Sequence, residues 1–179
     1  MIWWVSVLPW LVPCLVFALV VGTLASGRVA RWLGVRRPLA WVLLMSAGVI
    51  LAGTLTPLPG GSRLDFPPVG SCDLSRIGLA PLDQLHWPGD VLGNIIMFIP
   101  LGFAIALVPR SPRKAAVLIL AVALPFAIET TQLLVAPLGR GCQSADVVDN
   151  LTGLFIGLAV GAVVARLAPT LGRVAQTGG

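Results

Sequence analysis

Long runs of apolar residues, separated by short polar stretches, dominate the pattern of the chain. Five runs are long enough, or nearly so, to cross roughly 30 Å of hydrocarbon as a helix rising about 1.5 Å per residue. They occupy residues 5–25, 39–55, 91–108, 115–138 and 147–168. The pattern predicts an all-α polytopic membrane protein with about five transmembrane helices, folded as a single membrane domain over residues 1–179.

Residues 57–89 form the one long stretch without such a run, between the second and third predicted spans. Six prolines and several glycines argue against a long helix in this stretch. We therefore predict a loop outside the membrane. The apolar residues of its end, in the segment 77–87, indicate a return to the bilayer surface.

Composition supports a membrane location and argues against a soluble domain and against a nucleic-acid-binding protein. The 179 residues are 57% hydrophobic and 11% charged, and the mean hydropathy is +0.96. A soluble domain carries about 25% charged residues. The net charge of +5 does not indicate nucleic-acid binding, because phosphate recognition needs bases clustered on a soluble face.

The positions of the basic residues predict the orientation. In a five-span arrangement, nine of the twelve Lys and Arg residues fall on one side of the membrane: Arg28, Arg31, Arg36, Arg37, Arg110, Arg113, Lys114, Arg166 and Arg173. Loops rich in Lys and Arg stay in the cytoplasm. The N-terminus is therefore expected outside, the C-terminus in the cytoplasm, and the loop 57–89 on the extracytoplasmic side.

Two of the three cysteines lie outside the membrane in this arrangement. Cys72 and Cys142 would share the extracytoplasmic side, where an oxidising environment permits a disulfide. A bridge and two free thiols both fit the sequence. Cys14 lies within the first predicted span, where it fills apolar space.

Two similar segments begin the third and fifth predicted spans. The sequences DVLGN (90–94) and DVVDN (146–150) each place Asp first and Asn one helical turn later. An Asp at this position is a favoured helix N-cap, whereas an Asn inside an apolar helix needs a partner, either on another helix or in a ligand. Gly102 and Gly153 follow the two segments, and small residues at such depths allow helices to approach closely.

Glu129 is the most unusual residue, because it lies well inside the fourth predicted span. Carboxyl groups there usually face a partner or a water-filled cavity. Gln132 lies on the same helical face, and Arg140 is the nearest candidate cation. A buried structural pair and a ligand site remain equally open. A metal site could be formed by His86, Asp90, Glu129 and Asp146, but no metal-binding spacing is present and no cofactor is expected.

Three motifs, in this order, resemble a known family. They are D-x-x-x-N-x-x-x-F-x-P-L-G (Asp90, Asn94, Phe98, Pro100, Leu101, Gly102), E-x-x-Q (Glu129, Gln132), and Arg140 followed by D-x-x-x-N-x-x-G (Asp146, Asn150, Gly153). Together they resemble the VanZ-like family of small bacterial membrane proteins, over roughly residues 78–162. The resemblance implies a multi-pass protein of the bacterial cytoplasmic membrane. It also implies a possible link to resistance against the glycopeptide teicoplanin, with which the founding member is associated.

Two functions follow as hypotheses. In the first, seven polar residues bind an anionic ligand of the cell envelope near the outer leaflet: Asp90, Asn94, Glu129, Gln132, Arg140, Asp146 and Asn150. The ligand would be a lipid headgroup, a cell-wall precursor or a glycopeptide, and membrane lipids are the other expected partners. In the second, Glu129 is the general acid or base of an intramembrane enzyme. The absence of an activated nucleophile argues against catalysis. A small transporter is a third alternative, and the oligomeric state is left open.

Overall fold

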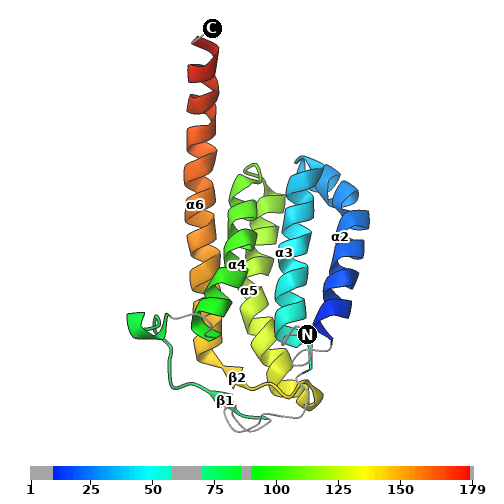
Figure 1. The fold of residues 1–179 in the computed structure, drawn as a ribbon, viewed down its shortest axis with the longest axis vertical. Coiled ribbons are helices and arrows are strands. Elements are labelled where there is room, and N and C mark those ends of the chain that lie inside the picture. The colour runs from blue at the N-terminus through cyan, green and yellow to red at the C-terminus, as the bar shows by residue number, and fades with distance from the viewer. Residues whose placement is uncertain (1–9, 58–69, 86–89, 178–179) are drawn as a thin grey trace, which may run out of the picture.

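Five long helices lie side by side in the computed structural model, which describes residues 10–57, 70–85 and 90–177, with side chains to Leu167 (Figure 1). They are α2 (Leu11–Leu33), α3 (Arg37–Leu55), α4 (Asp90–Leu107), α5 (Pro112–Leu134) and α6 (Ser144–Thr177). Each is long and apolar enough to cross a membrane, and the spanning part of α6 is Ser144–Leu167. The prediction of an all-helical protein with five helices able to span a membrane is confirmed.

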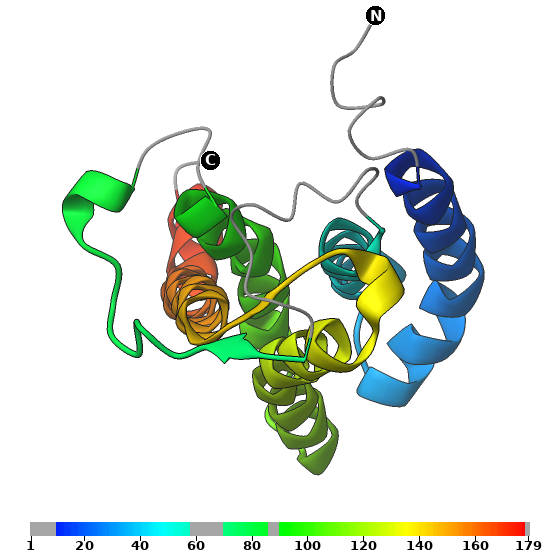
Figure 2. The same ribbon diagram turned by 90° about the horizontal axis from the view of Figure 1, so that it is seen from below.

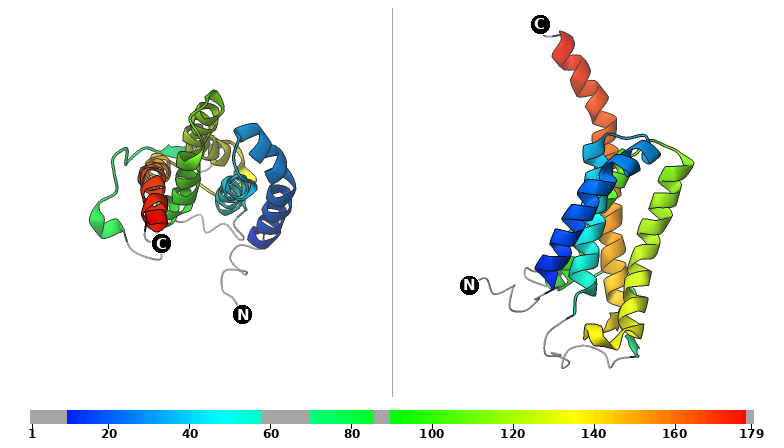
Figure 3. Two further views of the ribbon diagram at one scale, coloured as in Figure 1. Left: turned by 90° about the horizontal axis from the view of Figure 1, so that it is seen from above. Right: turned by 90° about the vertical axis from the view of Figure 1, so that its right-hand side faces the viewer.

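Successive helices run in opposite directions, so the bundle has two distinct ends (Figures 1 and 3). We call one the disulfide end. It carries the short strands β1 (Cys72–Asp73) and β2 (Cys142–Gln143), which pair in parallel, and the 3₁₀ helices η1 (Leu82–Gln84) and η2 (Ala136–Leu138). We call the other the basic end. It holds the α2–α3 and α4–α5 connections, with Arg28, Arg31, Arg36, Arg37, Arg110, Arg113 and Lys114.

The helix boundaries differ from the predicted spans where a backbone signal outweighs hydropathy. The first helix was predicted over 5–25 but continues to Leu33, so Arg28 and Arg31 lie inside it instead of following it. It ends at Gly34, whose left-handed backbone (φ 69°) lets its N–H donate to the Ala30 carbonyl. Residues 5–9 lie outside the described part of the chain. Helix α5 is the second case: it ends at Leu134, four residues before the end of the predicted span at residue 138.

The loop between α3 and α4 reaches around the outside of the bundle at the disulfide end. Its described part, 70–85, runs from β1 past α6 to η1, which lies beside the bundle (Figures 1 and 2). Leu74, Ile77, Leu79 and Leu82 are all exposed here. Their exposure is compatible with the predicted return to the bilayer surface, which stays a prediction.

Helices α4 and α6 run parallel and pack more extensively than any other pair in the described part of the chain. Glycines make the contact possible. A Cβ added to Gly153 would lie 2.0 Å from the Ile95 carbonyl oxygen, and one added to Gly157 would lie 2.1 Å from that of Ile99. A Cβ on Gly102 would meet the Leu154 carbonyl oxygen at 2.1 Å. The predicted role of Gly102 and Gly153 in close helix approach is thus confirmed, and the two D-V-x-x-N segments begin adjacent parallel helices.

Candidate functional site

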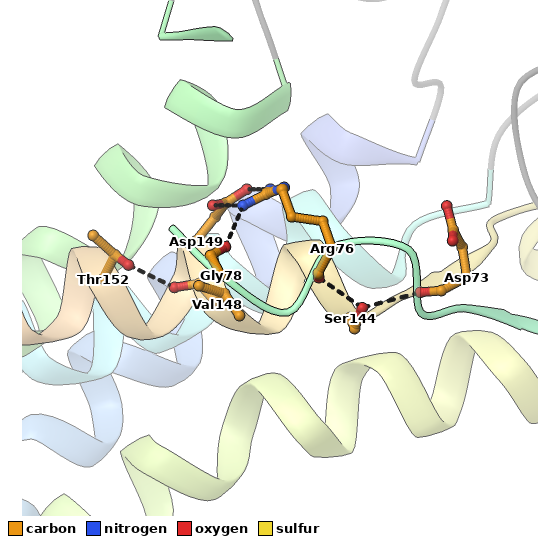
Figure 4. A network of polar contacts seen from close by, with 7 residues as sticks. All are labelled: Asp73, Arg76, Gly78, Ser144, Val148, Asp149 and Thr152. Atoms are coloured by element: carbon orange, nitrogen blue, oxygen red, sulfur yellow. Dashed lines mark hydrogen bonds and ion pairs between the residues drawn. The ribbon is translucent and has the colours of Figure 1, made fainter. Parts of the chain in front are cut away.

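A short strap formed by residues 72–78 is fastened across the disulfide end. Cys72 and Cys142 form a disulfide with a Cα–Cα distance of 4.5 Å. The Ser144 hydroxyl, in the first turn of α6, donates to the carbonyl of Arg76 at 2.8 Å and lies 3.2 Å from that of Asp73 (Figure 4). The disulfide therefore joins the strap to β2, and the hydrogen bonds of Ser144 join it to the first turn of α6.

A buried ion pair attaches the same strap one turn further along α6. The Arg76 guanidinium donates to both carboxyl oxygens of Asp149, at 3.0 and 2.5 Å, and to the Gly78 carbonyl at 3.0 Å (Figure 4). The Asp149 side chain is 2% exposed. Its hydrogen bond raises the pKa of Arg76, against the lowering effect of burial. Sequence reasoning missed this pair, although an acid next to Asn150 in so apolar a helix was a signal that a cation must meet it.

Arg140 and Gln132 both bind the end of α3. The guanidinium Nε of Arg140 donates to the Thr56 carbonyl at 3.0 Å and Nη2 donates to that of Gly53 at 2.8 Å. The Gln132 side-chain amide donates to the Thr54 carbonyl at 3.0 Å. The last carbonyls of a helix lack intrahelical partners and attract cations. These two side chains therefore complete the C-terminus of α3.

Three carboxylates influence Arg140 electrostatically without forming an ion pair with it in the described part of the chain. Asp146, Asp90 and Glu129 each raise the pKa of the Arg140 guanidinium, while burial, the larger effect, lowers it. In the described part of the chain, none of the three forms an ion pair with Arg140, and the one ion pair found is Arg76–Asp149. The suggested pairing of Glu129 with Arg140 is thus an electrostatic interaction at longer range.

Glu129 is buried at the junction of α5, α6 and the strap. It is 5% exposed, and its Oε2 accepts a hydrogen bond from the backbone N–H of Gln143 at 2.7 Å. It also lines a cavity of about 420 Å³, whose other walls come from α5, α6, β2 and the strap. None of the other six predicted site residues lines this cavity. The cavity beside Glu129 is therefore not shared with the other six residues, and a common pocket for all seven stays a prediction.

The two D-V-x-x-N segments occupy unequal environments. Asp90 is exposed and is the first residue of α4, while residues 86–89, including His86, lie outside the described chain. Asp146 is half-buried. It is not an N-cap as predicted, because α6 begins at Ser144 and places it within the first turn. Asn94 is half-buried, whereas Asn150 is 1% exposed. Within the described residues, the Asn150 Oδ1 has no hydrogen-bond partner.

The described residues contain no candidate metal site. Among the residues that the structure describes, no three His, Cys, Asp or Glu side chains lie close enough together to hold an ion.

Comparison with known proteins assigns the family. The model of the VanZ/LLP1 family matches residues 55–165, more than half of the chain. A search of curated proteins and a search of solved structures each found no match. The matched region begins at the end of α3 and includes the strap, Glu129, Arg140 and the α4–α6 contact. This chain is a multi-span membrane protein that belongs to the VanZ/LLP1 family.

Proposed function

We propose that this VanZ-like protein binds an anionic ligand of the cell envelope at its disulfide end. The binding group is the Arg140 cluster, which we define as Arg140 with Asp90, Glu129 and Asp146. The observation that carries the proposal is that only two of the three guanidinium nitrogens of Arg140 donate hydrogen bonds to described residues. Its Nε and Nη2 are held by carbonyls of the α3 end, whereas Nη1 has no hydrogen-bond partner among the described residues. A guanidinium fixed in this way is suited to donate to a phosphate or carboxylate.

The surrounding carboxylates restrict the class of ligand. Three acids near one cation would repel a simple anion, because like charges at close range oppose each other. The cluster suits a ligand whose phosphate or carboxylate is accompanied by ammonium, hydroxyl or amide donors. Phosphatidylethanolamine headgroups and lipid-linked cell-wall precursors carry such groups, as do glycopeptides.

Two observations support an extracytoplasmic position for the cluster. Seven Lys and Arg residues lie in or beside the two helix connections of the basic end, and connections of this kind remain in the cytoplasm. The disulfide lies at the opposite end, as expected for an oxidising compartment. We propose that the protein lies in the bacterial cytoplasmic membrane with the Arg140 cluster near the outer leaflet.

Ligand binding can be tested in purified protein. Labelled phosphatidylethanolamine and a labelled lipid-linked cell-wall precursor should be retained by the wild type, and Arg140→Gln should weaken retention at least about tenfold, equivalent to about 1.4 kcal/mol. Arg110→Gln, at the exposed basic end, is the matched control and should bind normally. Because Arg140 also caps α3, Arg140→Lys is measured in parallel to retain a cation there. If both Arg140 variants fold and bind as the wild type does, the proposal is wrong.

Glycopeptide resistance is a separate test of the cellular role. The family resemblance leads us to propose that expression in a susceptible Gram-positive host raises the teicoplanin concentration needed to stop growth. Arg140→Gln should remove the effect while protein abundance is unchanged. Equal growth inhibition with and without the wild-type protein would reject this role and leave lipid binding to be judged by the retention assay.

An intramembrane enzyme is the second candidate, and the position of Glu129 on a cavity wall favours it. Glu129 would transfer a proton as general acid or base, Asp146 would position it, and Arg140 would stabilise developing negative charge. Incubation of the protein with labelled envelope lipids separates the two functions. A covalently altered lipid, lost with Glu129→Gln, supports catalysis, whereas retention of unaltered lipid supports binding.

A further inference from the structure

The cavity beside Glu129 is lined by α5, by the first turns of α6, by β2 and by the strap. Its volume of about 420 Å³ falls in the range of about 300–1,000 Å³ that is typical of small-molecule sites. Phe126, Leu133, Val148 and Leu151 are among its apolar walls. Glu129 belongs both to the lining of this cavity and to the Arg140 cluster, so the cavity shares a residue with the proposed binding group.

Part of the cavity lining is exposed along the side of α5. Phe126 and Thr130 are exposed residues of α5 and line the cavity, and Phe126 is 52% exposed. Because α5 is a membrane-spanning helix, an opening along its side faces lipid chains instead of water. Ile77 of the strap also lines the cavity and is 74% exposed.

Glu129 offers a hydrogen-bond acceptor to this largely apolar space. Glu129 Oε2 is occupied by the Gln143 N–H, whereas Oε1 has no partner among the described residues. A carboxyl oxygen of this kind accepts a hydrogen bond from an ammonium, hydroxyl or amide group. An apolar space with few convergent polar groups is the usual form of a ligand site.

We propose that the cavity between α5 and α6 is a side-entry site for the hydrocarbon chain of a membrane lipid, whose donor-bearing headgroup hydrogen-bonds to Glu129. The inference rests on the proposed function, since it places the chain of the ligand whose phosphate or carboxylate contacts Arg140. It narrows the ligand class to an amphiphile, so a water-soluble headgroup without its chain should bind much more weakly.

A photoactivatable phosphatidylethanolamine with a diazirine in one acyl chain tests the chain site, in vesicles of phosphatidylcholine. Crosslinks are expected on the peptides that contain Leu133 and Val147–Leu151. Thr130→Trp should fill the opening and reduce these crosslinks at least tenfold. Thr130 tolerates replacement, because it is exposed and its hydroxyl bonds only the Phe126 carbonyl of its own helix. Ala116→Trp is the matched control at another exposed position of α5, and crosslinking should persist.

The outcomes separate this inference from the proposed function. Loss of the crosslinks in Thr130→Trp but not in Ala116→Trp supports the chain site. Crosslinks scattered over all five helices, or unaffected by Thr130→Trp, would overturn it even if headgroup retention still depends on Arg140. Crosslinks that vanish with Thr130→Trp but are unchanged in Arg140→Gln would support the chain site and reject the headgroup role of Arg140.

Discussion

Gly157→Ala is the most direct test of the contact between α4 and α6. The added Cβ would lie 2.1 Å from the Ile99 carbonyl oxygen and 2.8 Å from the Phe103 backbone nitrogen. Ordinary contact begins near 3.4 Å, so the helices would have to separate locally by about 1.3 Å. No side-chain rotamer can relieve this clash, because both neighbouring atoms belong to the backbone of α4.

The expected magnitude is a net loss of about 2 kcal/mol in the free energy of unfolding. Overpacking typically costs about 1–3 kcal/mol, and a clash with backbone belongs at the upper end. Replacing a helical glycine by alanine returns about 0.5–1 kcal/mol through the lower entropy of the unfolded chain. The remainder should lower Tm by roughly 4–8 °C in a chain of this size.

Gly93→Ala provides the matched control in α4, because a Cβ there would meet nothing within 4 Å. Thermal unfolding in detergent, followed by intrinsic tryptophan fluorescence, should show an unchanged or raised Tm for this control. Gly157→Ala should unfold at a lower temperature than the wild type and than Gly93→Ala. Equal Tm values for the wild type and both variants would show that α4 and α6 are not in the close contact described.

Three further changes test the strap and the end of α3, each by thermal unfolding. Arg76→Gln leaves the Asp149 carboxylate buried without its cation and should lower the free energy of unfolding by about 3–5 kcal/mol. Adding Asp149→Asn to Arg76→Gln should recover part of this loss. If the losses of the two single variants simply add in the double variant, the pairing is contradicted. Joint replacement of Cys72 and Cys142 by Ser should cost about 2–4 kcal/mol. Dithiothreitol should lower the Tm of the wild type but not that of the Cys-to-Ser double variant. An equal change in the Tm of these two proteins would argue against the disulfide. Gln132→Leu removes one interhelical hydrogen bond and should cost only about 0.6 kcal/mol; a severe loss of folding would indicate a larger role.

The transmembrane helices were predictable because their signal is local and redundant. Nearly twenty consecutive apolar residues identify a span without knowledge of its neighbours. The boundaries were less predictable where single residues decide them. Gly34 ends α2 through its left-handed backbone, and Pro137 cannot continue the ladder of an α-helix, so α5 gives way to the 3₁₀ helix Ala136–Leu138.

The candidate site was only partly predictable, because its contacts join distant parts of the chain. The pairing of Arg76 with Asp149 spans 73 residues, and nothing near either residue identifies the other. Arg140 was expected to meet the acid of α5, yet its donors reach carbonyls of the α3 end, 84 and 87 residues away. The carbonyls at a helix C-terminus also attract a cation, and hydropathy contains no information about which terminus is nearest.

The covalent link between Cys72 and Cys142 has a consequence for how the protein is made. Between the two cysteines the chain crosses the bilayer twice, through α4 and α5. The sulfurs therefore meet only after this hairpin has been inserted by the translocation machinery and both crossings are complete. If α4 or α5 failed to insert, Cys142 would be left across the bilayer from Cys72. Oxidation of this pair in newly synthesised chains should thus report correct biogenesis of the hairpin.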